Sequence, residues 1–314
     1  MKKIRKCSVI CFVIIFWIVL SVLGYLGKDT VYSQYTLDVN KKPYFVFVLE
    51  GIHDGIYPWS GKTISLWEKW EQISEENAKD DKENNSSKNN SKEQSGDYGT
   101  ENVGIDTENT EDGWKNQKRQ FQTVEEDYFS DAIFIGDSRT VGLHDYGGLD
   151  DATFYATVGL NVYDLWEKEH CEIDGKKMTL EELLTERKFG KIYFQIGINE
   201  MGRGTVDGFM GAYAQAIEKF REFQPDAIIF VQGIMKVAKE KSEQDEIFNN
   251  DGIEVRNERI AKLADNKNIF YLDMNEVVCD EDGNLRSDLT FDDVHLYGSK
   301  YGEWVQFLLE HGIQ

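Results

Sequence analysis

The pattern of apolar and polar positions divides the chain into four stretches. Residues 1–27 combine a basic start with one long apolar run, and residues 28–74 mix apolar, aromatic and polar positions. Residues 75–120 are almost wholly polar, and residues 121–314 carry short apolar runs separated by amphipathic segments. Only the last stretch has the repeated periodicity that predicts a folded domain with its own core.

The apolar run covers residues 7–26 and contains no charged residue. It has about the ~20 residues that a helix needs to cross a bilayer. Four basic residues precede it, Lys2, Lys3, Arg5 and Lys6. We predict a single-pass membrane anchor with a cytoplasmic N-terminus and the rest of the chain outside a bacterial cell. The alternatives are a cleaved signal peptide, whose apolar core is usually shorter, and a buried core helix.

The two stretches that follow the anchor differ in character. Residues 31–39 and 44–49 are β-like, residues 63–72 have helical periodicity, and the role of this juxtamembrane segment stays open. Between residues 75 and 112 there are twelve Asp and Glu against four Lys, with almost no apolar residue. Such a segment buries too little surface to offset its ordering entropy, so we predict a disordered acidic linker.

Strand and helix patterns alternate through residues 121–314. The expected strands are 132–135, 153–158, 191–196, 227–232 and 269–273. The expected helices are 160–169, 179–188, 206–223, 252–266 and 299–311, with a short helix or loop at 139–146. This order predicts one three-layer α/β/α domain with a parallel five-stranded sheet of flavodoxin type.

Polar residues with catalytic chemistry follow three of these patterns. The first strand ends at Gly136-Asp137-Ser138, which presents a hydroxyl at the carboxyl edge of the sheet, where open α/β sheets keep their sites. Serine is a weak nucleophile unless a base takes its proton. Near the C-terminus, His295 follows Asp292 by three residues, and a central strand ends at Gly197-Ile198-Asn199-Glu200.

These segments, with Gly142 and Gly159, resemble in order and spacing the four blocks of the SGNH/GDSL hydrolase family. The resemblance covers residues 128–314 and implies the flavodoxin-like fold, a serine hydrolase acting on ester bonds, and no cofactor or metal. It implies Ser138 as nucleophile and His295 as general base. Asp292 would orient the imidazole, and its i to i+3 spacing favours it over Asp293.

The oxyanion hole that the resemblance implies consists of the backbone N–H groups of Ser138 and Gly159 and the side-chain amide of Asn199. Each of these residues also has a plain structural interpretation. Ser138 and Asn199 are common helix caps, and Gly159 suits a turn with positive φ. The four blocks together favour the catalytic interpretation.

Two residues depart from the family's commoner pattern. Glu200 stands where Asp is more frequent, and Arg139 follows the serine where many relatives carry an apolar residue. An exposed Arg139 would bind a carboxylate or phosphate of the substrate, or would pair with Asp145 or Glu200. We therefore treat Arg139 and Glu200 as candidate substrate-binding residues. Three aromatic residues are either lining for a sugar-binding cleft or core: Tyr163, Trp166 and Tyr297.

The formal net charge of −22 argues against nucleic acid or anionic lipid as a partner of the soluble part, because binding to either needs basic patches. Of the four cysteines, Cys171 and Cys279 lie outside the apolar run. They form either one disulfide or two buried thiols. No cysteine or histidine spacing indicates a metal site.

The sequence thus favours an extracytoplasmic serine esterase that removes an O-acyl group, with acetyl preferred, from a carbohydrate or another ester. The first alternative is an O-acyltransferase that acts on a cell-surface polysaccharide with a membrane acyltransferase partner. The second alternative is a glycan-binding module without catalysis. In all three, an acylated carbohydrate or other ester is the expected ligand.

Overall fold

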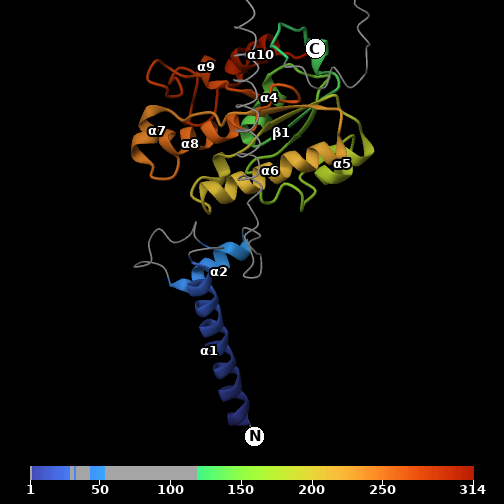
Figure 1. Cartoon of the computed structure of the whole chain (residues 1–314). Helices are drawn as coiled ribbons and strands as arrows, with labels where there is room; N and C mark the ends of the chain where they lie inside the picture. Colours follow the sequence, from blue (N-terminus) through green and yellow to red (C-terminus); the bar gives the residue numbers. More distant parts are fainter. Residues whose placement is uncertain (1, 29–31, 33–42, 54–118) are drawn as a thin grey trace, which may run out of the picture.

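A computed structural model describes residues 2–28, 32, 43–53 and 119–314. Residues 119–314 form three layers, with helices on both faces of a central sheet (Figure 1). The expected α/β/α architecture is therefore confirmed. The predicted linker, the strand at 31–39 and the helix at 63–72 lie wholly or almost wholly outside the described residues.

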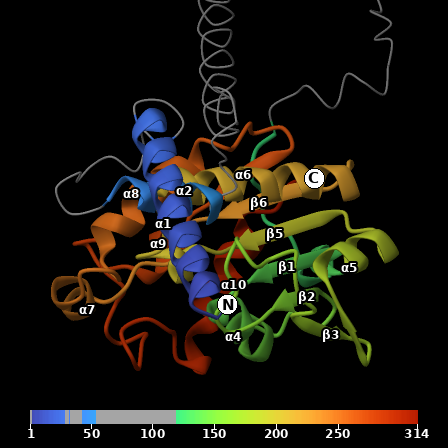
Figure 2. The ribbon, with the colours of Figure 1, turned by 90° about the horizontal axis from the view of Figure 1, so that it is seen from below.

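The sheet has five parallel strands in the order β2-β1-β5-β6-β7. Figure 2 shows β2, β1, β5 and β6 side by side. The strands are β1 (Ala132–Gly136), β2 (Thr153–Ala156), β5 (Lys191–Gln195), β6 (Ile228–Gln232) and β7 (Ile269–Leu272). This is the flavodoxin order, in which the chain reverses direction across the sheet between β1 and β5.

Each face of the sheet has its own hydrophobic core. The first core holds Ile133 and Ile135 of β1 and is covered by α5 (Leu180–Glu186), α6 (Val206–Phe223) and α8 (Asn250–Ala261). The second holds Phe134 and is covered by α4 (Ser138–Tyr146), α9 (Asn275–Val278) and α10 (Tyr301–Glu310). Successive strand residues point to opposite faces, so uninterrupted apolar runs fill both cores.

A row of aromatic rings crosses the second face of the sheet. Phe134 stacks on Phe154 of β2 at 5.0 Å and on Tyr193 of β5 at 4.4 Å between ring centroids. Tyr193 stacks in turn on Phe230 of β6 at 4.4 Å. Because in-register neighbours in a parallel sheet lie beside one another, one aromatic position per strand produces a continuous ladder.

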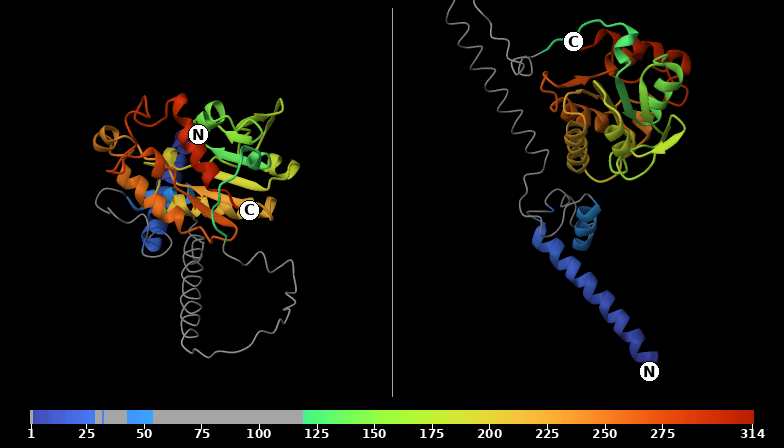
Figure 3. Two further views of the ribbon diagram at one scale, coloured as in Figure 1. Left: turned by 90° about the horizontal axis from the view of Figure 1, so that it is seen from above. Right: turned by 90° about the vertical axis from the view of Figure 1, so that its right-hand side faces the viewer.

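The two ends of this domain lie side by side (Figure 3). Gln122 and Gly312 exchange backbone hydrogen bonds of 3.0 and 2.9 Å, and the Val124 N–H donates to Leu309 at 2.8 Å. A short 3-10 helix, η3 (Glu126–Phe129), then leads into β1. The segment that enters the domain is thus fixed to its last helix.

Two helices are described before residue 119, α1 (Lys2–Gly27) and α2 (Tyr44–His53). The predicted strand at 44–49 is wrong, because these residues form α2. Val46 N–H bonds Pro43 O at 2.9 Å in its first turn, while Phe47 and Val48 are buried in a small core with Leu20 of α1. An unbroken apolar run cannot by itself distinguish a buried strand from a helix, and here packing on α1 decides.

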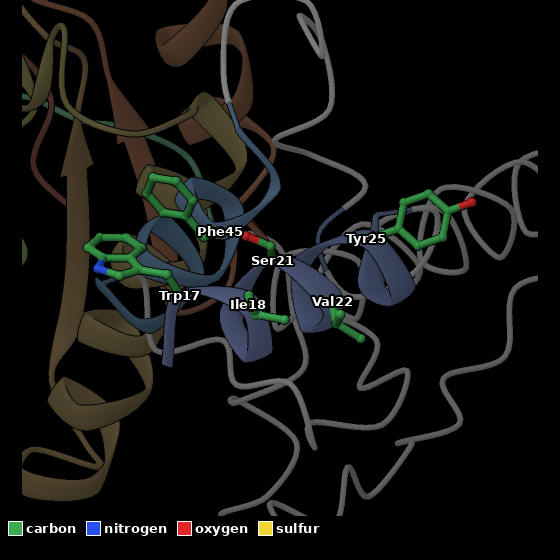
Figure 4. A pocket seen from close by; sticks show the side chains of 6 residues that line it. All are labelled: Trp17, Ile18, Ser21, Val22, Tyr25 and Phe45. Atoms are coloured by element: carbon green, nitrogen blue, oxygen red, sulfur yellow. The ribbon is translucent and has the colours of Figure 1, made fainter. Parts of the chain in front are cut away.

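The helix pair carries an open apolar groove of about 530 Å³ (Figure 4). It is lined by Trp17, Ile18, Ser21, Val22 and Tyr25 of α1 and by Phe45 of α2. Within the part of the chain that the structure describes, no helix meets the length and hydropathy needed to cross a membrane. The membrane anchor therefore stays a prediction.

The predicted helix at 160–169 is also wrong, because these residues form a series of turns. The Val162 N–H donates to the Glu200 carboxylate and the Asp164 N–H donates to the Asn161 side chain, so neither bonds an i−4 carbonyl. The following polar stretch forms a hairpin that the sequence did not predict, β3 (Cys171–Ile173) and β4 (Lys176–Met178). The other predicted strands and helices lie within a few residues of their predicted positions, whereas α7 (Lys239–Gln244) and α9 were not predicted.

Candidate active site

The candidate residues gather where the strand order reverses. Gly136, the last residue of β1, pairs with Ala156 of β2 on one side and with Gln195 of β5 on the other. The segments that leave these three strands therefore start next to one another. They carry Ser138, Gly159 and Asn199, as the sequence predicted for the carboxyl edge of the sheet.

A tight turn presents the Ser138 hydroxyl. Ser138 is the first residue of α4, and Asp137 caps the helix by accepting a hydrogen bond from the Arg139 N–H at 3.0 Å. Gly136 is required here, since a Cβ on it would lie 2.0 Å from Thr140 Oγ1 and 2.6 Å from the Gln195 carbonyl oxygen. Ser138 thus starts a helix with its hydroxyl half-exposed at the sheet edge.

His295 lies on a loop whose two ends are joined by backbone hydrogen bonds. The loop begins and ends at the Thr290–Leu296 bridge, and the Tyr297 N–H donates to Leu289 at 2.8 Å. Asp292 Oδ1 accepts from the backbone N–H groups of Val294 and His295 at 3.0 and 2.7 Å. The same residue that faces the histidine ring therefore also shapes the backbone that carries it.

The three side chains form one hydrogen-bonded chain. His295 Nδ1 lies 2.7 Å from Asp292 Oδ2, and His295 Nε2 lies 2.8 Å from Ser138 Oγ. A carboxylate only accepts, so the ring carries its proton on Nδ1 and leaves Nε2 free to accept the serine proton. Burial favours a higher pKa for Asp292, but the hydrogen bonds from the His295 ring and from two backbone N–H groups outweigh it and lower the pKa.

Backbone donors face the same edge of the sheet. Gly159 has φ of +79°, a conformation that glycine adopts without steric cost. Among the described residues, neither the Ser138 N–H nor the Gly159 N–H has a hydrogen-bond acceptor. Both are therefore available for an oxyanion.

Asn199 joins the β5 exit to the β2 exit. Its amide Nδ2 donates to the Leu160 carbonyl at 2.9 Å, which uses one of its two N–H groups and leaves one for a ligand. Because Leu160 follows Gly159 directly, this bond holds two of the predicted oxyanion donors together.

The sequence suggested Glu200 as a substrate-binding residue, but the structure places it out of reach of a substrate. Its side chain is fully buried, and Oε1 accepts from the Val162 N–H at 2.6 Å. Burial raises the pKa of this carboxyl to about 8, although the Val162 hydrogen bond opposes the rise. Glu200 is a second link between the β5 and β2 exits, one residue beyond the link made by Asn199.

Arg139 is likewise buried rather than exposed, with 1% of its surface accessible. Its side chain pairs with neither Asp145 nor Glu200, and its Nε donates to the Val294 carbonyl at 3.3 Å. The guanidinium also interacts electrostatically with Asp137, Tyr301 and Asp292, and burial lowers its pKa. Arg139 thus connects the turn that carries Ser138 to the loop that carries His295. The expectation of an exposed Arg139 was wrong.

The protein-family description of GDSL-like lipases and acylhydrolases matches residues 134–299, more than half of the chain. The chain belongs to this family. It is therefore a serine hydrolase of the class that acts on ester bonds. The match spans Ser138, Gly159, Asn199, Asp292 and His295.

The chain is also similar to several solved structures. A GDSL-like lipase from Bacteroides thetaiotaomicron is 18% identical, with a TM-score of 0.44 over 56% of this chain and 84% of its own. A catalytic mutant of Axe2, an acetylxylan esterase from Geobacillus stearothermophilus, is 15% identical, with a TM-score of 0.39 over 57% of this chain and 91% of its own. No curated protein sequence matches the chain.

The other candidates lie outside this GDSL site or beside it. Trp166 packs on Phe220 and Phe223 and is partly core, whereas Tyr297 is 44% exposed next to the His295 loop. Cys171 and Cys279 are free thiols. Over the described residues, no three His, Cys, Asp or Glu side chains are placed to hold a metal ion.

The sequence did not single out Phe291, which is 61% exposed with its ring 6.2 Å from that of His295. The available signal was a large aromatic residue placed directly before the two aspartates that precede His295. That signal is weak in a chain with 18 phenylalanines.

Proposed function

We propose that the chain is an esterase that removes an O-acyl group, preferably acetyl, from a carbohydrate through an acyl-Ser138 intermediate. The observation that carries the proposal is the continuous chain from Ser138 Oγ to His295 Nε2 at 2.8 Å and from His295 Nδ1 to Asp292 at 2.7 Å. This arrangement supplies a nucleophile, a base in the correct tautomer and a carboxylate that stabilises the imidazolium.

In the first half-reaction, His295 Nε2 takes the Ser138 proton as Oγ attacks the ester carbonyl. The oxyanion accepts hydrogen bonds from the N–H groups of Ser138 and Gly159 and from the second amide N–H of Asn199. His295 then donates its proton to the departing sugar hydroxyl. In the second half-reaction, a water molecule gives a proton to His295, attacks the acyl-serine and releases the acid, and the proton returns to Ser138.

A neutral, accessible substrate fits the surroundings of the site. Ser138 is half-exposed, and Asp292 is 38% exposed beside it. Carboxylates at the mouth of a site repel phosphate and carboxylate groups, so an acylated neutral sugar suits it better than an anionic phospholipid. We also propose that residues 7–26 anchor the chain in a membrane with the domain outside the cell; protease digestion of residues 119–314 on intact cells tests this location.

The test of the reaction uses the full-length chain and p-nitrophenyl acetate, with Ser138→Ala and His295→Ala as variants. We expect each variant to lose nearly all turnover, by about 10⁴-fold or more. Intact mass after acid quenching should show an acetyl adduct on the wild type and none on Ser138→Ala. Full activity in Ser138→Ala would exclude the mechanism. A long-lived adduct that only an added sugar releases would instead identify an acyltransferase.

A further inference from the structure

Exposed apolar side chains of residues 119–314 are concentrated around the site. Seven large ones are exposed: Phe121, Tyr146, Val158, Ile247, Val255, Phe291 and Tyr297. Four of them lie on the segments that carry Ser138, Gly159 and His295, namely Tyr146 on α4, Val158 before Gly159, and Phe291 and Tyr297 on either side of His295. Clustered exposure of this kind indicates a binding surface rather than scattered surface residues.

Phe291 and Tyr297 form the part of this surface nearest the base. Their ring centroids are 5.8 Å apart, and Phe291 is 61% exposed. The Phe291 ring lies within 20° of parallel to the His295 imidazole at 6.2 Å. Because the Tyr297 ring is tilted by 50° from that of Phe291, a ligand ring resting on Phe291 would be bordered by Tyr297 and would lie near the His295 imidazole.

The loop that carries the two rings is closed on both sides. Tyr297 N–H bonds Leu289 O at 2.8 Å, and Asp293 O accepts from the Ala238 N–H at 2.9 Å. The backbone that carries the rings is consequently held in place before any ligand arrives. A preorganised loop loses little conformational entropy on binding, which favours its use in recognition.

Tyr146 continues the surface away from His295. It is 63% exposed at the end of α4, and its ring stacks on Tyr301 at 6.0 Å. A Cβ on Gly298 would lie 2.8 Å from the Tyr146 ring, so Tyr146 lies directly against the residue that follows Tyr297. The aromatic surface therefore runs from the catalytic loop to the end of α4.

We propose that Phe291, Tyr297 and Tyr146 form a platform that binds the pyranose ring carrying the ester. This inference rests on the proposed function and names the residues that select its substrate. Aromatic faces attract the C–H face of a sugar ring, and the two tyrosine hydroxyls are hydrogen-bond partners for sugar hydroxyls. The adjacent Asp145, Asp292 and Asp293 disfavour an anionic lipid headgroup on the same surface.

The experiment compares two acetate esters on the full-length protein, glucose pentaacetate and ethyl acetate, by acetate release. The double variant Phe291→Ala/Tyr297→Ala should lower kcat/KM for glucose pentaacetate relative to kcat/KM for ethyl acetate by roughly tenfold or more. Val255→Ala, which removes another exposed apolar side chain on α8, should leave the ratio unchanged. An unchanged ratio in the double variant would overturn the platform.

Binding without turnover separates the platform from the chemistry. Saturation-transfer NMR with glucose pentaacetate on Ser138→Ala should show contact with the sugar-ring protons, and adding Phe291→Ala/Tyr297→Ala should abolish it. Contact that survives the double substitution, or displacement by phosphatidylglycerol vesicles but not by glucose, would refute the platform. Sugar contact through these rings in a wild type that hydrolyses neither ester would refute the esterase and leave the platform intact.

Discussion

At the scale of single residues, the site depends on which carboxylate faces His295. Asp292 holds the ring at 2.7 Å and also accepts from two backbone N–H groups, whereas the adjacent Asp293 has φ of +69° and contributes its carbonyl to Ala238. The spacing rule that favoured Asp292 in the sequence agrees with this geometry. The two aspartates differ enough in role to be separated by substitution.

Asp292→Asn should lower kcat by roughly 10³-fold or more with little change in KM. The amide can present an N–H to the ring and thereby favour the tautomer that cannot accept the serine proton. Asp293→Asn is the matched control, because Asn tolerates positive φ, and it should retain most of the activity. Equal losses of kcat in the two variants would contradict the assignment of Asp292.

Arg139 shows why a residue next to a nucleophile need not touch the substrate. Its guanidinium is buried close to Asp137, which is 2% exposed and whose pKa burial raises. The sequence identified the residue as unusual, but no local pattern reports burial of a charged side chain. Burial here follows from contacts with Val294 and Tyr301, more than 150 positions further along the chain.

Arg139→Met should destabilise the fold by about 2 to 4 kcal/mol at neutral pH, because Asp137 loses its nearby positive charge in a buried position. The loss should shrink at acid pH, where protonation of Asp137 removes the unpaired charge. Urea unfolding at several pH values measures both effects. Arg221→Met, at a partly exposed arginine 3.8 Å from Asp265, is the control and should change stability little.

At the scale of elements, two hydrogen bonds connect the β5 exit to the β2 exit. They run from Asn199 to the Leu160 carbonyl and from the Val162 N–H to Glu200. These bonds replace the helix that periodicity predicted at 160–169. The amphipathic pattern was real, but the Asp164 N–H and the Leu160 carbonyl, which would bond each other in a helix, bond the side chains of Asn161 and Asn199 instead.

Glu200 should make stability depend on pH. Its pKa rises from 4.5 to about 8 on folding, so between these values the folded protein binds a proton that the unfolded chain does not. Stability from this group is therefore greatest below pH 4.5 and declines as pH rises to about 8. Glu200→Gln retains an acceptor for Val162 and removes this dependence.

The measurement is the free energy of unfolding of wild type and Glu200→Gln, from urea titrations between pH 5 and pH 8. The difference, variant minus wild type, should increase with pH over this range, with a slope of at most about 1.4 kcal/mol per pH unit. A difference that stays constant would mean that Glu200 ionises normally in the folded protein.

At the scale of the whole molecule, the sequence predicted the flavodoxin-like sheet and the location of the site correctly, whereas its prediction for residues 44–49 was wrong. Apolar runs such as 132–135 are bounded by turn residues and alternate with helices, which leaves few topologies. The run at 44–49 lacks such neighbours. Its helical form in α2 depends on packing against Leu20, a contact that no window of local sequence contains.

The clusters of buried residues indicate that residues 119–314 fold without the rest of the chain. Both large cores draw only on residues between 128 and 313, and the small core of Leu20, Tyr32, Phe47 and Val48 contains no residue of 119–314. A fragment of residues 119–314 should therefore melt within a few degrees of the full-length protein and hydrolyse p-nitrophenyl acetate with the same kcat/KM. The site residues all lie inside the fragment. A well-folded but inactive fragment would therefore show that residues before 119 complete the active site. A fragment that fails to fold would show that those residues complete a core.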